Sequence, residues 1–272
     1  MERILTQQFE GKVALVTGGA SGIGAAFART VVRDGGRIAI ADLNQDMGRA
    51  LVAELGIDKA SFTRTDVSQQ DDVIAFVDGA AAHFGRIDIL FNNAGIGGMG
   101  TTLDLDAAAF RRVIEVDLFS VFYGCKAALP HMLRNGSGTI VNNASIAGML
   151  GDFGMTAYNT AKGGVVNYTR ALAMDMAKSG IRVNAVCPGC VDTPLFAGLK
   201  AAESVFDNFI RAVPMARIGQ AEEIAEVVAF LASDKASYMT GAVIPVDGGI
   251  TATSGFPDLA PFMEILQKGF NA

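Results

Sequence analysis

The sequence predicts a single-domain α/β fold, in which a doubly wound parallel sheet of about seven strands is flanked by helices. Short runs rich in β-branched and other apolar residues alternate with Ala-rich helical stretches along the chain. The length of 272 residues is ordinary for one such domain. Since no repeat, low-complexity tract or Pro/Ser-rich linker divides the sequence, we expect residues 1–272 to form one domain.

The composition argues against several classes of protein. The net charge is -6 and no cluster of Lys or Arg is present, which argues against nucleic acid or an anionic membrane as a partner. Half of the residues are apolar, but no uninterrupted apolar run reaches the ~18 residues that suggest a membrane-spanning helix. The stretch Met1–Gln8 lacks the apolar segment and cleavage site of a signal peptide, so we expect a cytoplasmic location.

The three cysteines do not suggest a disulfide framework, because their number is odd. Cys187 and Cys190 are spaced like a redox Cys-x-x-Cys pair, but such a pair normally lies at a helix N-terminus, which lowers the pKa of its first thiol. Here the pair follows a strand-like run and leads into a loop, and one pair of thiols is too few for a structural zinc site. We therefore expect neither redox chemistry nor a bound metal.

A glycine-rich turn lies between the first predicted strand, residues 12–17, and a helix that runs to about Arg33. In a strand–turn–helix context, glycines let the backbone approach a pyrophosphate, and the helix N-terminus offers free N–H groups. The residues of this turn that we expect to bind a dinucleotide are Gly18, Ser21, Gly22, Ile23 and Gly24. The alternative is a tight turn without a ligand.

Asp42 ends the second predicted strand, residues 37–42, roughly twenty residues beyond the glycines. An acidic side chain there can accept hydrogen bonds from the adenosine ribose diol and would repel a 2′-phosphate. Leu43 and Asn44, which follow, offer such a phosphate no cation. The sequence therefore predicts NAD rather than NADP as the cofactor.

The alternation of strands and helices continues to residue 246. Further strands are predicted at 61–66, 87–92, 140–145, 181–186 and 242–246, with a long helix at about 106–133 and another at 157–176. Ligands of such sheets bind beyond the carboxyl ends of the strands. The residues that fall at those ends are Asp42, Asp66, Asn93, Ser145 and Pro188.

Tyr158 and Lys162 are four residues apart in the helix at 157–176, so their side chains share one face. A phenol beside an ammonium loses its proton more easily, because the positive charge favours the phenolate. The pair is therefore a candidate general acid/base. The same spacing also arises by chance on helices, so the catalytic interpretation of this pair depends on the other motifs in the chain.

Two segments near the C-terminus are less regular. Residues 190–214, with Phe196, Leu199, Phe206 and Phe209, indicate a substrate lid or, alternatively, an ordinary pair of surface helices. The C-terminal extension, residues 251–272, is rich in large apolar side chains: Phe256, Leu259, Phe262, Met263, Ile265, Leu266 and Phe270. Phe262, Ile265 and Leu266 have the spacing of an amphipathic helix. We expect the extension to cross a subunit interface; the alternative is that it covers its own domain.

Over about residues 10–250, the chain resembles the short-chain dehydrogenase/reductase family. The matching motifs are Thr17-Gly18-x-x-x-Gly22-x-Gly24, Asp66-Val67, Asn92-Asn93-Ala94-Gly95, Ser145, Tyr158-x-x-x-Lys162, Pro188-Gly189, Arg217-Ile218-Gly219 and Val246-Asp247-Gly248-Gly249. The resemblance implies a Rossmann fold and a homotetramer. It also implies that Tyr158 exchanges a proton with the substrate, that Lys162 assists it and bonds the nicotinamide ribose, and that Ser145 binds the substrate oxygen. The residues it places at the cofactor are Asp66, Val67, Asn93, Tyr158, Lys162, Val191 and Thr193.

One member of the family's catalytic set differs. Asp117 stands in the long helix where the family usually has Asn, a residue taken to hold a water that links the lysine to solvent. A carboxylate or a backbone carbonyl can still accept a hydrogen bond from that water, so we expect the relay to survive. A carboxylate would also favour the charged form of Lys162.

These features predict an NAD-dependent oxidoreductase that reversibly converts a small, neutral secondary alcohol to a ketone. The predicted substrate pocket contains no Lys or Arg and consists mainly of apolar residues: Ile96, Ala147, Met149, Leu150, Phe153, Met155 and Cys190. A polyol or sugar alcohol is one alternative, because Asp152 and Asn159 could bind hydroxyls. The others are a 3-oxoacyl carrier-protein reductase, which calls for NADPH and a basic docking patch, and a dinucleotide sensor without turnover.

Overall fold

A computed structural model of the chain describes residues 7–197, 202–255, 259, 262 and 263. Its centre is a parallel sheet of seven strands in the order β3-β2-β1-β4-β5-β6-β9. The strands are β1 (Val13–Thr17), β2 (Arg37–Asp42), β3 (Ala60–Arg64), β4 (Ile89–Asn92), β5 (Gly138–Asn143), β6 (Ile181–Pro188) and β9 (Val243–Val246). The order reverses beside β1, as in a doubly wound sheet, so the predicted fold class is confirmed.

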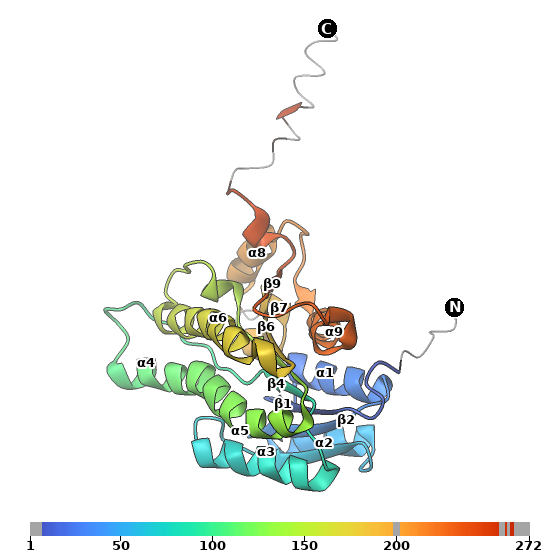
Figure 1. Cartoon of the computed structure of the whole chain (residues 1–272). Coiled ribbons are helices and arrows are strands. Elements are labelled where there is room, and N and C mark those ends of the chain that lie inside the picture. The colour runs from blue at the N-terminus through green and yellow to red at the C-terminus, as the bar shows by residue number, and fades with distance from the viewer. Residues whose placement is uncertain (1–6, 198–201, 256–258, 260–261, 264–272) are drawn as a thin grey trace.

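Helices cover both faces of this sheet. One layer consists of α1 (Gly22–Arg33), α2 (Gln45–Leu55) and α9 (Ala221–Ala232), which share a hydrophobic core with the sheet. The other layer is formed by α3 (Gln70–Phe84), α5 (Ser120–Asn135) and α6 (Thr156–Met176), with α4 (Ala107–Ile114) packed against α6 (Figure 1).

The sequence of β1 shows why the central strands have no polar face. All five of its residues are buried, and successive side chains point to opposite layers. Ala14 and Val16 join the core on the side of α1, whereas Val13 and Leu15 join the core on the side of α3. Polar side chains therefore collect beyond the ends of the central strands.

The element boundaries differ from the predicted ones in a few places. β3 ends at Arg64 and β5 at Asn143, so Asp66 and Ser145 lie in the loops that follow these strands. The predicted helix at 106–133 is not continuous, because a π-helical turn, η1 (Glu115–Phe119), separates α4 from α5. One wider turn rotates the residues after it relative to a regular helix, and such turns are frequent at functional sites.

The region predicted as a lid begins with a short strand, β7 (Val191–Asp192), which pairs in parallel with β8 (Gly219–Gln220). A 3₁₀ turn, η4 (Pro194–Phe196), follows, and α8 (Glu203–Ala212) lies beyond the undescribed residues 198–201, which include Leu199. The ring of Phe196 contacts those of Phe206 and Phe209, with centroids 6.2 and 5.4 Å apart. The apolar residues of this segment therefore pack on one another.

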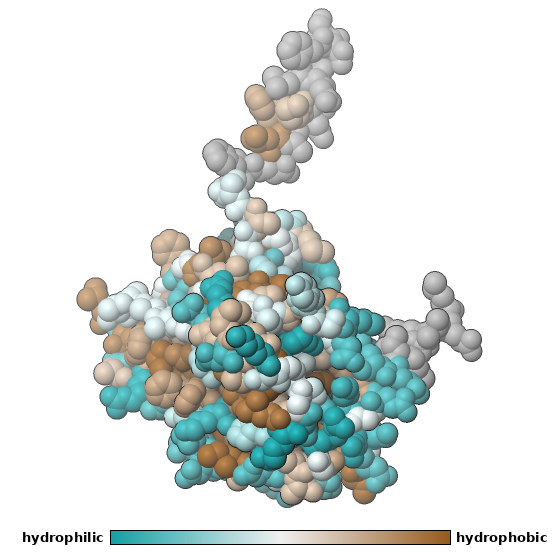
Figure 2. Space-filling model, viewed as in Figure 1, coloured by the Kyte–Doolittle hydropathy of each residue, from teal (hydrophilic) through white to brown (hydrophobic). Residues whose placement is uncertain are grey.

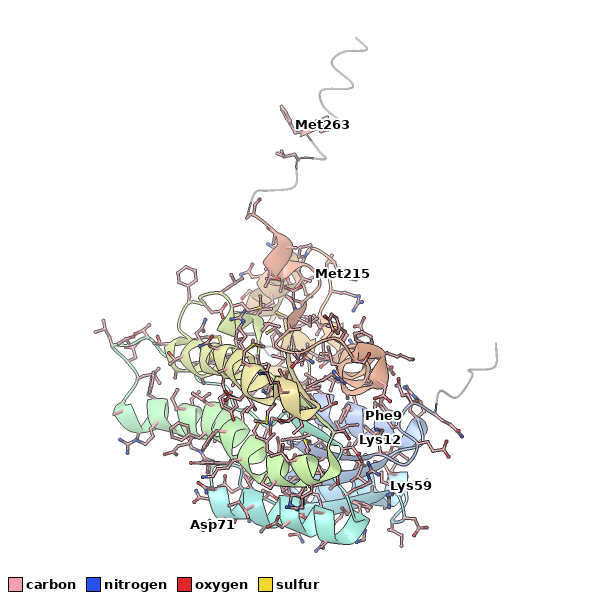
Figure 3. The ribbon with its side chains drawn as sticks, in the orientation of Figure 1. Phe9, Lys12, Lys59, Asp71, Met215 and Met263 are labelled. Carbon is pink, nitrogen blue, oxygen red and sulfur yellow. The ribbon has the colours of Figure 1, made fainter. Side chains whose placement is uncertain are left out.

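Four further 3₁₀ turns complete the described elements: η2 (Ile146–Gly148), η3 (Ala177–Ser179), η5 (Asp234–Ala236) and η6 (Ile250–Ala252). Beyond η6, Leu259, Phe262 and Met263 are exposed at 57, 54 and 53%. Met263 lies outside the body of the domain, far beyond Met215 (Figure 3). Phe256, Ile265, Leu266 and Phe270 fall outside the described residues, and so does most of the expected C-terminal helix. Among the described helices, none has the length and apolar character needed to cross a membrane.

Candidate active site

The glycine turn between β1 and α1 is shaped by close backbone contacts. Gly18 and Gly22 have φ of 61 and 50°, in the left-handed region that favours glycine. A Cβ on Gly18 would lie 2.8 Å from Ala94 Cα, and one on Gly24 would overlap the carbonyl oxygen of Gly18. No side chain caps the N-terminus of α1 at Ser21. The turn thus leaves an open backbone cradle at a helix N-terminus, as a pyrophosphate site requires.

Asp42, at the carboxyl end of β2, is held against this turn. One carboxylate oxygen accepts a hydrogen bond from Ala20 N at 3.0 Å, and the other accepts one from Asn44 N at 2.9 Å. The carboxylate is only partly buried, so it can still reach a ligand on the turn. These contacts bring the second predicted cofactor motif together with the first.

Asn93 joins the end of β4 to the same turn. Its side-chain amide donates to the carbonyl oxygens of Thr17 and Gly18, at 3.0 and 2.9 Å. The hydroxyl oxygen of Thr17 accepts from the backbone N–H groups of Asn93 and Ala94. Asn143, at the end of β5, donates its amide to Asn93 Oδ1 at 3.0 Å. Three neighbouring strand ends are therefore tied together beside the cradle.

Asn143 is a residue of this network that the sequence did not single out, and Thr17 was named only as part of the glycine motif, without a role. Both are the last residues of strands, and that position was the signal that could have identified them.

Asp66 and Val67 lie in the loop after β3. Asp66 Oδ1 accepts hydrogen bonds from both the backbone N–H and the hydroxyl of Ser68, at 3.0 and 2.7 Å. Partial burial raises the pKa of Asp66, but the hydrogen bonds from Ser68 outweigh this and leave it below its usual value. Val67 is buried, and it packs with Val73 and Val116.

Tyr158 and Lys162 lie on the first turns of α6, as predicted. Lys162 Nζ is 5.6 Å from the centroid of the Tyr158 ring and donates to the carbonyl oxygen of Asn143 at 3.0 Å. The Lys162 side chain is only 4% exposed, whereas Tyr158 is half-buried. The lysine is therefore fixed in place, and the phenol stays accessible.

Ser145 follows β5 and caps the short turn η2. Its hydroxyl oxygen accepts a hydrogen bond from Ala147 N at 3.1 Å. A hydroxyl has one hydrogen to donate as well as lone pairs to accept. Since this contact uses only a lone pair, and no described residue accepts from the hydroxyl, the Ser145 hydrogen is available to a substrate oxygen.

Asp117 lies in the π-helical turn and is 0% exposed. Its Oδ1 accepts from Ile96 N at 2.8 Å, and its Oδ2 is 3.4 Å from Lys162 Nζ. Burial raises the pKa of Asp117, against the opposing attraction of the ammonium. For Lys162, burial is the largest influence and lowers the pKa, but the charge and hydrogen bond of Asp117, together with smaller contributions from Tyr158 and Cys187, make the net direction upward.

The predicted substrate residues differ in how deeply they are buried. Ala147 is buried, and Ile96, Met155 and Cys190 are half-buried. By contrast, Leu150 and Phe153 are exposed at 52 and 106%, and Met149 at 41%, so these three do not form a buried wall. Gly100 N donates to Gly154 O at 2.7 Å, which joins the loop carrying Phe153 to the loop that follows β4.

Val191 and Thr193 complete the predicted cofactor residues. Val191 is buried in β7, and Thr193 lies against the glycine turn, since a Cβ on Gly22 would be 3.2 Å from Thr193 Cγ2. The start of the predicted lid is thus adjacent to the cradle.

The cysteines show no sign of the redox pair that their spacing superficially suggests. Cys125, Cys187 and Cys190 are free, and burial raises the pKa of both Cys187 and Cys190 to about 11, so these two thiols are protonated at neutral pH. Among the described residues, no cluster of His, Cys, Asp and Glu is suitable for a metal ion.

A cavity of about 570 Å³ lies far from these residues. It is lined by residues such as Lys12, Asp88, Thr139 and Arg182, which are at the amino ends of strands. It contains none of the predicted site residues, so the chemistry of the chain is concentrated at the other edge of the sheet.

Comparison with known proteins defines the class to which this fold and site belong. A family model described as "Enoyl-(Acyl carrier protein) reductase" matches residues 18–251. The chain belongs to the short-chain dehydrogenase/reductase family, and it is therefore an oxidoreductase of a family that uses nicotinamide cofactors.

Individual relatives match over nearly their whole length. The chain is 49% identical to cis-4-hydroxycyclohexanecarboxylate dehydrogenase of Sinomonas cyclohexanicum over 250 residues, which cover 90% of the chain and 99% of that protein. It is 41% identical to cyclohexanol dehydrogenase of Acinetobacter sp. (strain SE19), with 93% of the chain and 100% of that protein covered. The crystal structure of levodione reductase has a TM-score of 0.85 and 39% identity, and the match covers 90% of the chain and 99% of that structure.

Proposed function

We propose that the protein uses NAD to oxidise a small, neutral secondary alcohol to a ketone, in a reversible reaction. The observation that carries this proposal is the arrangement of Tyr158, Lys162 and Ser145 beside a glycine cradle to which Asp42 is hydrogen-bonded. The names of the relatives, which include cyclohexanol dehydrogenase and levodione reductase, support a cyclic alcohol as the substrate.

A dinucleotide fits the residues at the carboxyl edge of the sheet. The backbone cradle would hold its pyrophosphate, because side chains at Gly18 or Gly24 would fill the space. The residues that would hold the rest are Asp42 for the adenosine ribose, Asp66 and Val67 for the adenine, and Asn93, Tyr158, Lys162, Val191 and Thr193 for the nicotinamide half. When bound, the nicotinamide ring supplies the hydride acceptor or donor.

The preference for NAD rests on the charge of Asp42. Its carboxylate faces the turn without an ion pair among the described contacts, and it would repel the 2′-phosphate of NADP. Its two oxygens can also accept hydrogen bonds from a ribose diol, which NADP lacks.

The proposed chemistry of the chain is a proton transfer next to the hydride transfer. Tyr158 would take the hydroxyl proton of the alcohol, or return it to the ketone oxygen, while the fixed positive charge of Lys162 assists. Ser145 would donate its free hydrogen to the same oxygen and so stabilise the charge that develops there. Asp117 and the carbonyl of Asn143 hold Lys162 in position.

Three alternatives fit the described residues less well. For a polyol dehydrogenase, Asn159 could bind a substrate hydroxyl only through its Oδ1, which is buried, because its amide nitrogen already donates to Leu150 O at 2.8 Å and to Asp152 at 3.3 Å. A carrier-protein reductase needs a basic patch, but Arg29, Arg33, Arg86 and Arg217 each pair with a carboxylate. A sensor without turnover would not require the complete set of Ser145, Tyr158 and Lys162.

The direct test is a rate assay with a panel of alcohols. Cyclohexanol, 4-hydroxycyclohexanecarboxylate, 2,3-butanediol and sorbitol would each be incubated with the protein and NAD⁺, and then with NADP⁺, while the NADH absorbance band is recorded. We expect the highest kcat/KM with cyclohexanol and NAD⁺. Turnover of sorbitol alone, or a preference for NADP⁺, would contradict the proposal.

We also propose that the protein acts as a homotetramer in the cytoplasm. Apolar side chains on the surface of α5 support association, since Phe122 and Leu133 are exposed at 42 and 48%. Hydrophobic surface gathers over α4 and α5 (Figure 2), where Leu105, Phe110, Ile114 and Phe119 line a hollow of about 610 Å³.

A further inference from the structure

The ion pair between Asp117 and Lys162 is almost completely removed from solvent. The two side chains are 0 and 4% exposed, and Oδ2 of Asp117 is 3.4 Å from Nζ of Lys162. Apart from this ion pair, the Oδ2 atom has no hydrogen-bond partner among the described residues, because Ile96 N bonds the other oxygen. The second oxygen of Asp117 is therefore committed to the lysine.

The backbone around the pair is arranged to let the two charges approach. The π-helical turn carries Asp117, and a Cβ on Gly95 would lie 3.2 Å from Asp117 Oδ2 and 3.4 Å from Lys162 Nζ. Any side chain at position 95 would crowd both groups. The missing side chain at Gly95 and the position of Asp117 in the π-helical turn therefore both allow the carboxylate and the ammonium to approach each other.

The other titratable groups that face Lys162 do not balance its charge. They are Tyr158, on the same helix, and Cys187, on β6. Burial raises the pKa of the Cys187 thiol to about 11, so it is neutral at physiological pH. Among the groups that the structure describes around Lys162, Asp117 is the carboxylate, and its Oδ2 lies 3.4 Å from Nζ as an ion pair.

We propose that Asp117 is the counter-ion of Lys162 and sets the pH at which Tyr158 gives up its proton. This inference rests on the proposed function, in which Tyr158 exchanges the proton of the alcohol. An isolated ammonium beside a phenol favours the phenolate, whereas an ammonium paired with a carboxylate has no net charge and a weaker field. Asp117 therefore keeps Lys162 charged and in place, and it limits how far the lysine promotes ionisation of Tyr158.

An amide at this position would have the same shape without the charge. Asp117→Asn keeps an oxygen to accept from Ile96 N, and it leaves Lys162 as an unbalanced positive charge beside Tyr158. The variant should therefore ionise Tyr158 at lower pH. The control is Asp58→Asn, which makes the same change of net charge at an exposed loop before β3, at the opposite edge of the sheet.

The chain is well suited to a spectroscopic test, because it has 4 tyrosines and no tryptophan. The phenolate absorbance of each protein would be titrated without cofactor or substrate, and Tyr158→Phe would identify the Tyr158 transition by subtraction. We expect this transition to move to lower pH by about one unit in Asp117→Asn and to stay in place in Asp58→Asn. The rising limb of the alcohol oxidation rate against pH should move by the same amount.

Three results would overturn the inference. The Tyr158 transition could stay in place or move to higher pH in Asp117→Asn. The same shift could appear in Asp58→Asn, which would make it an effect of net charge. Asp117→Asn could be folded and bind NADH yet have no activity at any pH, which would make the carboxylate an obligatory proton acceptor.

If Asp117→Asn does not fold, the smaller Asp117→Ser removes the same charge and gives the same readings. The titration uses neither cofactor nor alcohol. It therefore still tests the link between Asp117 and Tyr158 if the proposed function is wrong.

Discussion

At the scale of single residues, Asp42 combines a structural and a recognition role. Its carboxylate accepts from the backbone N–H of Ala20, in the glycine turn, and from that of Asn44, just after β2, so the same side chain that shapes the turn would select the cofactor. We predict that Asp42→Asn, which keeps the shape and removes the charge, narrows the preference for NAD⁺ over NADP⁺ by about tenfold or more. The measurement is kcat/KM with each cofactor and one alcohol.

Asp58→Asn serves as the control for this experiment, because it removes an exposed charge at the far edge of the sheet. An unmutated protein that uses both cofactors with equal efficiency would rule out the role given to Asp42.

Residues at the ends of strands were the most predictable part of the site. Asp42, Asn93 and Ser145 could be placed from the sequence, because parallel strands bring their carboxyl ends to one edge. The hydrogen bond from Asn143 to Asn93 could not, since it depends on the register of two strands that are 50 residues apart. The exposure of Phe153 was also not predictable, because nothing local to a loop shows which way a side chain points.

At the scale of elements, the main difference from the predicted fold is the π-helical turn before α5. The residues of η1 contain neither Gly nor Pro, so no local signal marks it. It is linked to a distant contact, the hydrogen bond from Ile96 N to Asp117 Oδ1. The pairing of β7 with β8 was missed for a related reason, since two-residue strands are too short to show a period.

The contact between α5 and β4 gives a test of how these elements hold the site. Gly124 is buried on α5, and a Cβ there would overlap Asn92 Oδ1 at the end of β4, directly before Asn93. We predict that Gly124→Ala lowers the free energy of unfolding by on the order of 1–3 kcal/mol, because the helix must move away from the strand. Thermal unfolding followed by circular dichroism measures the change.

Gly79→Ala is the matched comparison on α3. A Cβ on Gly79 would meet nothing within 4 Å. The free energy of unfolding of this variant should therefore rise by about 0.5–1 kcal/mol, because alanine has a better helix propensity than glycine. Shifts of the same sign and size in the two variants would show that the contact with Asn92 is not the cause.

At the scale of the whole molecule, the C-terminal extension and the apolar surface point to association of subunits. The described residues Leu259, Phe262 and Met263 are more than half exposed in the single chain, and each large apolar side chain contributes about 1.5–3 kcal/mol when it is buried. We predict that deletion of residues 254–272 lowers the mass of the protein in solution below that of a tetramer and raises the KM for the alcohol. Light scattering and steady-state kinetics give the two readings. A truncated protein that is still a tetramer and has an unchanged KM would show that this prediction is wrong.

A single substitution tests whether Tyr158 transfers the proton in an NAD-dependent alcohol oxidation. Tyr158→Phe removes the transferable proton and keeps the aromatic ring beside Lys162. The measurement is the initial rate of NADH formation from NAD⁺ and cyclohexanol, together with the dissociation constant of NADH by fluorescence titration. We predict that the rate falls by about 10²–10⁴-fold while NADH binding is nearly unchanged. A variant that keeps a substantial part of the rate, with its fold and NADH binding intact, would contradict it.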